Sequence, residues 1–396
     1  MTRNDDNDAP LLLDVSRLVW RCWTGTRPTG IDRICLAWMH YYGPRAQAVI
    51  IHRYGNVILP MKTSQALFQL LGQPDRSRSD RARFRTALAA LLITRIAHLR
   101  DRLDGRGRFL LNPGHTGLDR PGIFPWTRAR HLRPICLVHD LIPITHPQFC
   151  RAGEEVRHRR RMSSVLDIAC GVVTNSADTL KTLSDFAGAE GRLLPSATVA
   201  WPGVPAMPAV SQLASAEAIF VVLGTIEARK NHAMLLELWR RMIDSADGKP
   251  LPQLVIVGRR GWQAEGVFAR LDSGEFGDRV IEVGPADDLR LAELLATARA
   301  LLFPSHAEGF GMPLVEALAA GVPVLASDLP AFREIGQDVP EFLPTDDLAA
   351  WGEAVADYAN EASVRRTAQL ERLERFHAPD WERHFAKINS LLSLLS

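Results

Sequence analysis

The chain alternates short apolar runs with longer stretches in which apolar residues recur every three or four positions. Short apolar runs are typical of strands buried on both faces of a parallel sheet, and the longer period is that of a helix. The predicted strands are 11–15, 49–51, 109–111, 134–138, 171–174, 218–223, 254–258, 280–284 and 300–303, with a further extended run at 322–325. This alternation predicts the α/β class, with two Rossmann-like parallel-sheet domains.

A proline-rich stretch without strong periodicity separates the two halves. It runs from Val199 to Ser215, and such stretches are typical of links between folded units. We therefore expect an N-terminal domain at 1–205 and a C-terminal domain at 206–376. The remaining 377–396 contain one apolar helical face, formed by Trp381, Phe385, Ile388, Leu392 and Leu395.

Composition narrows the class of protein. The 396 residues are 46% hydrophobic and 23% charged, with a formal net charge of +2, which favours an enzyme without a nucleic-acid partner. The five cysteines show no metal-binding spacing, and the polar N-terminus is unlike a signal peptide. No apolar run approaches the ~20 residues that span a bilayer. We therefore expect a cytoplasmic protein.

An arginine-rich stretch at 80–103 has the pattern of an amphipathic helix. Its apolar face comprises Phe84, Leu88, Leu91, Leu92, Ile96, Leu99 and Leu103. Such a helix can lie on anionic headgroups, which would make the protein peripheral on the inner face of the cytoplasmic membrane. A surface helix packed on the core, with solvated arginines, fits the pattern equally.

The stretch from Phe303 to Pro323 concentrates the candidate chemistry. Glu308 and Glu316 flank a glycine-containing loop at 309–312, and Pro313 then favours the start of a helix. Backbone N–H groups at a helix N-terminus bind anions, with the helix dipole adding to the attraction. Carboxylates beside an anion site fit a ligand with phosphates flanked by hydroxyls, as in a nucleotide sugar. The alternative is that the two glutamates only stabilise the positive end of a helix.

Two strand–helix junctions carry glycine and basic residues. Gly224 leads into a loop ending in Arg229 and Lys230, which are placed to bind a diphosphate. Gly30 would let a ligand approach the backbone, and Arg33 could meet a phosphate. Solvated surface charge is the alternative in both places. Neither loop is a G-x-G-x-x-G, so dinucleotide binding lacks its main signature.

Two further polar pairs follow predicted strands. His139 and Asp140 lie where open α/β sheets bind ligands, and could bind sugar hydroxyls or move a proton. Capping of the next turn is the alternative. Asp287 and Asp288 are interpreted as a loop and helix cap, and no D-x-D metal signature is evident, so we expect no metal.

On these motifs the second half resembles the retaining glycosyltransferases of family 4, which have the GT-B fold. The resemblance rests on G-T-I-E-A-R-K-N at 224–231, V-I-V-G-R-R-G-W at 255–262, E-G-F-G-M-P-L-V-E at 308–316 and A-A-G-V-P-V-L-A-S at 319–327. The first half is similar, at 29–33, 139–140 and 173–176, to bacterial polysaccharide members, many of them mannosyltransferase-like. The family's usual glycine pair in the first loop is Thr29-Gly30 here.

The resemblance implies two domains facing across a cleft, with 377–396 returning to the N-terminal domain as a helix. Arg229 and Lys230 would bind the diphosphate. Glu316 would bind the ribose, and Glu308 would contact the sugar. The residues with an expected catalytic role are His139, Asp140, Arg229, Lys230 and Glu308. The expected donor-binding residues are Gly30, Arg33, Gly224, Arg229, Lys230, Glu308, Gly309, Phe310, Gly311, Met312 and Glu316.

The implied activity is transfer of a sugar, with retention at the anomeric carbon and without cofactor or metal. The donor would be a nucleotide diphosphate sugar, first of all GDP-mannose. The acceptor would be a glycan or a polyprenyl-diphosphate-linked oligosaccharide in surface polysaccharide synthesis. Two rivals stay open: a nucleotide-sugar epimerase or hydrolase of the same fold, and a non-catalytic nucleotide-sugar-binding partner subunit.

Overall fold

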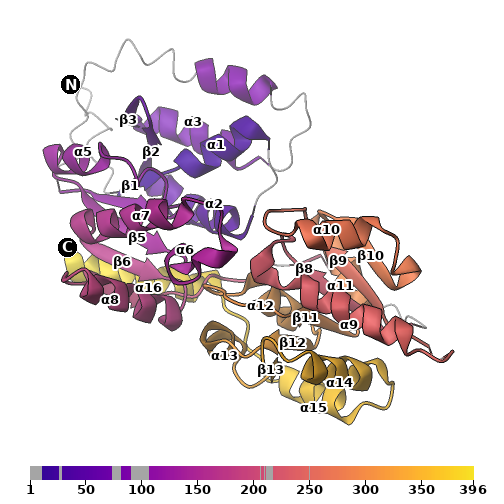
Figure 1. Cartoon of the computed structure of the whole chain (residues 1–396). Helices are drawn as coiled ribbons and strands as arrows, with labels where there is room; N and C mark the ends of the chain where they lie inside the picture. The colour runs from indigo at the N-terminus through magenta and orange to yellow at the C-terminus, as the bar shows by residue number, and fades with distance from the viewer. Residues whose placement is uncertain are drawn as a thin grey trace.

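The computed structural model describes residues 11–25, 29–73, 82–90, 107–205, 207–208, 210, 217–248 and 250–396. Two sheets organise these residues, one in each half of the chain, and Figure 1 shows them side by side in two separate bodies. All the strands predicted from the sequence are present, with ends shifted by at most a few residues. The two Rossmann-like parallel-sheet domains predicted from the alternation are confirmed.

The N-terminal sheet has seven strands in the order β3-β2-β1-β4-β5-β6-β7, and only the β2–β3 pair is antiparallel. The strands are β1 (Leu11–Asp14), β2 (Ala46–His52), β3 (Gly55–Ile58), β4 (Phe109–Asn112), β5 (Arg133–Val138), β6 (Gly171–Thr174) and β7 (Ser196–Val199). Its α-helices are α1 (Ser16–Thr24), α2 (Gly30–Tyr42), α3 (Met61–Leu71), α5 (Ile123–Ala129), α6 (Ile142–Thr145), α7 (Glu154–Ile168) and α8 (Ala177–Ala189).

The C-terminal sheet has six parallel strands in the order β10-β9-β8-β11-β12-β13. They are β8 (Ile219–Leu223), β9 (Gln253–Val257), β10 (Val280–Gly284), β11 (Ala300–Phe303), β12 (Val324–Ser327) and β13 (Glu341–Leu343). Its α-helices are α9 (His232–Asp244), α10 (Glu265–Asp272), α11 (Asp288–Thr297), α12 (Met312–Ala319), α13 (Pro330–Gly336), α14 (Leu348–Ala359) and α15 (Val364–Leu373).

Both sheets reverse their strand order next to the first strand, between β1 and β4 and between β8 and β11. Open α/β sheets bind ligands outside the carboxyl ends of the strands at such a switch point. In the C-terminal sheet this point brings together the loops that follow β8 and β11. The topology therefore joins the motif at Gly224–Lys230 to the motif at Glu308–Glu316, although they lie far apart in the sequence.

Some sequence-based boundaries were wrong. Ser16–Thr24 forms helix α1, which the sequence pattern did not predict. Helix α2 begins at Gly30, because Thr29 and Asp32 form a capping box that satisfies the first N–H groups. Helix α12 begins at Met312, one residue before the expected proline. Ser176 is the N-cap of α8, since its Oγ accepts the Thr179 N–H at 3.0 Å.

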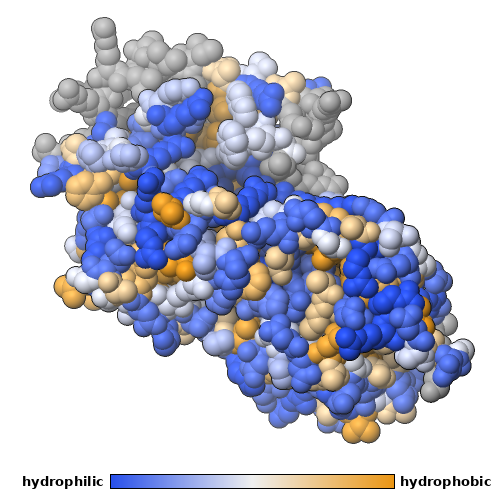
Figure 2. All heavy atoms as spheres, in the orientation of Figure 1, coloured by the Kyte–Doolittle hydropathy of each residue, from blue (hydrophilic) through white to orange (hydrophobic). Residues whose placement is uncertain are grey.

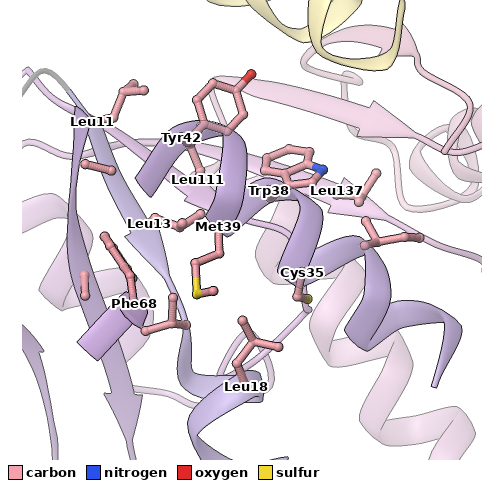
Figure 3. Close-up of a cluster of buried hydrophobic side chains, with 14 of the residues drawn as sticks. Leu11, Leu13, Leu18, Cys35, Trp38, Met39, Tyr42, Phe68, Leu111 and Leu137 are labelled. Carbon is pink, nitrogen blue, oxygen red and sulfur yellow. The ribbon is translucent and has the colours of Figure 1, made fainter. Parts of the chain in front are cut away.

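The N-terminal core forms where α1, α2 and α3 cover the sheet. Figure 3 shows Cys35, Trp38, Met39 and Tyr42 of α2 directed at leucines of β1, β4 and β5. Trp38 is fully buried. Apolar residues at three- and four-residue spacing on α2 thus meet strands that are apolar throughout, as the period of the sequence requires.

The basic stretch at 80–103 lies only partly within the described residues. Residues 82–90 are helical, with Phe84 and Leu88 buried. Its Arg85 guanidinium lies 5.0 Å from the ring of Trp23 and donates to the Trp23 carbonyl at 2.9 Å. The rest of the predicted membrane-binding helix falls outside the described residues. No helix in the described part of the chain is long and apolar enough to cross a membrane, and the face seen in Figure 2 is mostly hydrophilic over the C-terminal domain.

The last helix, α16 (Trp381–Leu395), returns to the N-terminal domain and contacts β6 and β7. Phe385, Ile388 and Leu392, which were predicted to share one face, are buried there. His384 of this helix accepts the Trp38 Nε1–H at Nε2 (2.9 Å), and its Nδ1 lies 3.1 Å from the Ala200 carbonyl oxygen. A carbonyl only accepts and an indole only donates. His384 is therefore neutral, with its proton on Nδ1.

We predict that His384→Gln makes the protein less sensitive to acid. Burial lowers the pKa of His384 to about 4, against about 6.5 in an unfolded chain. The unfolded state therefore binds more protons between these values, and stability falls as the pH drops from 6.5 to 4. Glutamine can serve the same partners without titrating. Denaturant unfolding measures the free energy of unfolding at pH 7 and at pH 4.5. Between these pH values the wild type should lose on the order of 2 kcal/mol more of this free energy than the variant. Equal losses would contradict the assignment of a neutral, buried His384.

Candidate donor site at the domain interface

The candidate site is built on a buried ionic cluster at the switch point of the C-terminal sheet. Glu308, after β11, contacts two cations from the loop after β8: Lys230 Nζ lies 2.5 Å and Arg229 Nη1 lies 2.7 Å from its Oε1. Arg229 also pairs with Glu227 at 2.8 Å. The exposed fractions are 9% for the Lys230 side chain, 11% for Glu308 and 17% for Arg229. Two predicted diphosphate-binding residues and the predicted sugar-facing carboxylate therefore form one cluster.

Burial and pairing set the protonation states of this cluster. Burial alone would raise the pKa of Glu308, but Arg229 and Lys230 lower it to about 2. Burial alone would lower the pKa of Arg229, yet Glu308 and Glu227 reverse that shift and raise it. Burial lowers the pKa of Lys230, and Glu308 offsets this only in part. The carboxylate is thus ionised at neutral pH and holds both cations in place.

Close backbone approaches shape the floor of the site. Gly224 adopts a φ of 131°, and a Cβ there would lie 3.3 Å from Lys230 Cε. A Cβ on Gly258, after β9, would lie 1.8 Å from the Gly224 carbonyl oxygen. The Lys230 ammonium also lies 4.5 Å from the centroid of the Phe303 ring. Glycine at 224 and 258 therefore leaves room for Lys230 to reach the end of β11.

The loop after Glu308 presents unpaired backbone donors. Gly311 has a φ of 105° and precedes the first residue of α12. Among the hydrogen bonds of the described residues, none is donated by the N–H groups of Gly309, Phe310 or Gly311. The Phe310 side chain is buried in the core, so only its backbone can serve a ligand. These N–H groups at a helix N-terminus have the arrangement of an anion site.

Glu316 lies on α12 and meets the N-terminal domain. Its Oε1 accepts from Arg33 Nη1 at 3.0 Å, and Arg33 Nη2 lies 2.5 Å from Asp288 Oδ1. Burial raises the pKa of Glu316, and Arg33 offsets that shift only in part. Arg33, which was predicted to meet a phosphate, is thus paired with two carboxylates of the other domain. Asp287, not Asp288, caps α11 by accepting the Arg290 N–H at 2.9 Å.

Glu316 also lines a cavity of about 600 Å³ between α11, α12 and the two segments that connect the domains. Its walls are largely apolar and include Val204, Pro205 and Trp381. None of the other predicted site residues lines this cavity. The ionic cluster therefore lies at the domain contact and not in the cavity.

The N-terminal domain contributes His139 after β5. Its Nε2 lies 2.7 Å from the Pro113 carbonyl oxygen, so Nε2 carries the proton. Nδ1 is then an acceptor, and it is buried without a protein partner. Burial lowers the pKa of His139 to about 4, so the ring is neutral at pH 7. It can accept a hydrogen bond from a hydroxyl through Nδ1 and cannot donate one there.

Asp140 and Gly30 play local roles in the described structure. Asp140 Oδ1 accepts the Ile142 N–H at 3.1 Å, which is the capping role that the sequence left open. Gly30 is the first residue of α2, and a Cβ there would lie 3.8 Å from Met312 Cγ across the domain contact. The two predicted donor-binding residues, Gly30 and Met312, therefore approach each other.

Sequence reasoning missed several polar residues around the site. Asp32 is buried and bonds Arg17 Nε and Arg21 Nε at 2.6 Å each, and only its place in a capping box could have indicated this role. The rings of His115 and His139 have centroids 5.0 Å apart. Within the described residues no group of three or more His, Cys, Asp or Glu side chains is arranged to hold a metal ion.

Several known proteins are similar in sequence to part of this chain. Residues 204–366 match the family described as Glycosyl transferases group 1. The serotype-specific mannosyltransferase WbdA of Escherichia coli is 31% identical over 260 residues, which cover 58% of this chain and 30% of that protein. The phosphatidyl-myo-inositol mannosyltransferase of Mycobacterium leprae is 32% identical over 158 residues, covering 39% of this chain and 40% of that protein. The matches thus span less than half the length of these relatives.

Solved structures share the fold. HepE of Anabaena, in complex with UDP and glucose, superposes with a TM-score of 0.67 at 14% identity, covering 97% of this chain and 99% of that one. Sucrose-phosphate synthase of Thermosynechococcus elongatus gives a TM-score of 0.59 at 16% identity, covering 100% and 97%. The GT-B fold implied by the sequence motifs is confirmed, and residues 204–366 are similar to the glycosyl transferases group 1 family.

Proposed function

We propose that this chain is a hexosyltransferase that moves a sugar from a nucleotide diphosphate sugar to a hydroxyl of a glycan or lipid-linked acceptor. The observation that carries the proposal is the cluster of Arg229, Lys230 and Glu308 beside the unpaired N–H groups of Gly309–Gly311. Diphosphates need cations and N–H donors, and sugars need carboxylates that accept from hydroxyls. Glu316 supplies a further buried carboxylate for the ribose.

The chemical role of the cations follows from where charge develops. As the bond between the anomeric carbon and the diphosphate oxygen breaks, negative charge grows on the leaving group. Arg229 and Lys230 are already oriented by Glu308 and stabilise that charge without rearrangement. The neutral His139 accepts a hydrogen bond from a sugar hydroxyl through Nδ1. Asp140 lies close enough to Arg229 to stabilise its charge.

We propose that the reaction retains the anomeric configuration and uses no metal ion. The acceptor oxygen forms its bond to the anomeric carbon on the face from which the diphosphate leaves. The acceptor proton passes to the departing diphosphate oxygen, so no enzyme nucleophile is required. Closing of the two domains on the donor would exclude the water that competes with the acceptor.

The relatives favour mannose as the sugar, since several are mannosyltransferases that act on O-antigen chains or phosphatidyl-myo-inositol. HepE is bound to UDP, so a shared fold does not decide the base. From the family resemblance we propose a polyprenyl-diphosphate-linked or other glycan acceptor at the cytoplasmic face of the membrane. Membrane contact through 80–103 stays a prediction, because most of that stretch lies outside the described residues.

Lys230→Met is expected to lower kcat/KM at least ~100-fold, the range found when one preorganised donor to a developing oxyanion is removed. Transfer of radiolabelled mannose from GDP-mannose to a lipid extract of the source cells measures this. Lys181→Met, on an exposed lysine of α8 paired with Asp185, is the matched control. Wild-type turnover by Lys230→Met would contradict the site. Free mannose released without acceptor would instead indicate a hydrolase, and donor binding without turnover a non-catalytic subunit.

Glu316→Gln should raise the donor KM about 10-fold, since a hydrogen bond to a charged acceptor is worth roughly 1.5–3 kcal/mol. Ribose binding is separated from general damage by a donor whose ribose lacks both hydroxyls. The wild type should bind that analogue more weakly than the normal donor, whereas Glu316→Gln should bind the analogue and the normal donor almost equally. Glu293→Gln, on an exposed pair with Arg290, should behave as wild type. If removing the ribose hydroxyls weakens binding to Glu316→Gln as much as it weakens binding to the wild type, Glu316 does not bind the ribose.

A thermal-shift panel of GDP-, UDP-, ADP- and dTDP-sugars tests the donor. A ligand that binds only the folded state raises the unfolding temperature according to its concentration over Kd. We expect the largest rise with GDP-mannose. A rise only with another nucleotide would overturn the GDP proposal and leave sugar transfer standing.

A further inference from the structure

The N-terminus of α8 is occupied by groups from the other domain. Of its first N–H groups, that of Ala177 donates to both Glu334 carboxylate oxygens at 2.8 Å, and that of Asp178 donates at 3.4 Å. Glu334 lies on α13 of the C-terminal domain and also accepts the Trp201 Nε1–H at 2.7 Å. Carboxylates bind well at the positive end of a helix. This helix end is therefore capped across the domain boundary.

Two hydroxyl groups at the same helix end hold the loop at 309–312, here called the donor loop. Ser176 Oγ donates to the Gly309 carbonyl oxygen at 2.7 Å, and Thr179 Oγ1 donates to the same oxygen at 3.1 Å. Each hydroxyl has one proton, and the Ser176 lone pair is used by the Thr179 N–H. Both hydroxyl groups are buried. Both hydroxyls therefore reach one carbonyl of the other domain, while Ser176 Oγ also lies 3.0 Å from Thr179 Oγ1, and Thr179 Oγ1 lies 3.5 Å from the His139 carbonyl oxygen.

This carbonyl determines the direction of a donor N–H. The Gly309 C=O and the Phe310 N–H belong to one planar trans peptide, in which they point in opposite directions. Fixing the carbonyl towards α8 therefore turns the Phe310 N–H to the opposite side of the loop, where no described residue accepts from it. Only glycine allows the approach, because a Cβ at 309 would lie 2.1 Å from the His139 carbonyl oxygen.

We propose that Ser176, Thr179 and Glu334 form a latch that holds the domains together and aims the Phe310 N–H at the donor. Separating the domains would expose a carbonyl, two hydroxyls and the first N–H groups of α8 to water. The contacts that close the two domains are thus the same contacts that orient the donor loop. Ser176 and Thr179 are positioning residues that act through Gly309 and do not touch the donor. The link to the donor rests on the function proposed above, whereas the link to closure does not.

Thr179→Val is the direct test, because it removes the hydroxyl while leaving the Ser176 cap and the buried volume in place. Hydrogen exchange should quicken about three- to ten-fold at the Ala177 and Asp178 amides, which donate to Glu334 across the domain contact; this is the range that one net hydrogen bond is worth. kcat/KM for GDP-mannose should fall by a similar factor. Thr179→Ser should restore both. Thr182→Val is the matched control, since Thr182 bonds only the Asp178 carbonyl within α8.

Glu334→Gln provides a second, independent arm. It should quicken exchange at Ala177 and, through the shared closure, lower kcat/KM for GDP-mannose. Wild-type exchange at Ala177 in Thr179→Val would overturn the latch, as would equal effects of Thr179→Val and Thr182→Val. If the wild type transfers no sugar, the proposed function fails, and the exchange measurements still decide the latch.

Discussion

Much of the site depends on the way one buried carboxylate neutralises two buried cations. Arg229 and Lys230 would be costly to remove from water without a partner, because a buried unpaired charge is strongly unfavourable. Glu308 supplies that partner from a loop that lies more than seventy residues away in the chain. The ion pairs therefore join the loops after β8 and β11 at one point. They also hold both cations at the place where the proposed donor's diphosphate would bind.

The two domains meet through close backbone approaches and through side-chain hydrogen bonds. Gly309 meets the His139 carbonyl, and Gly30 meets Met312. Arg33 reaches Glu316 and Asp288, while α8 receives Glu334 and the Gly309 carbonyl. Each contact joins a residue of one domain to a residue of the other. The position of the N-terminal domain is thus coupled to the shape of the donor loop.

The strands could be predicted because they are apolar throughout, and no other element of this length buries both faces. The start of α2 was missed because it is determined by Thr29 and Asp32, whose roles become clear only when Arg17 and Arg21 bond the same carboxylate. Helix α1 was missed because Trp20 and Trp23, with 63% and 40% exposed, blur its apolar face. Boundaries of this kind depend on tertiary partners.

The sequence by itself determined the two-domain α/β fold and the residue types at the candidate site, since both follow from local patterns: apolar runs, glycine at junctions, and cations and carboxylates at strand ends. Only the tertiary structure decided which of these residues meet. It paired Arg33 with Glu316, placed Lys230 on Glu308, and brought Ser176 and Thr179 to Gly309. These partners are distant in the chain, and the distances between them depend on how the sheets and domains pack, which no local pattern specifies.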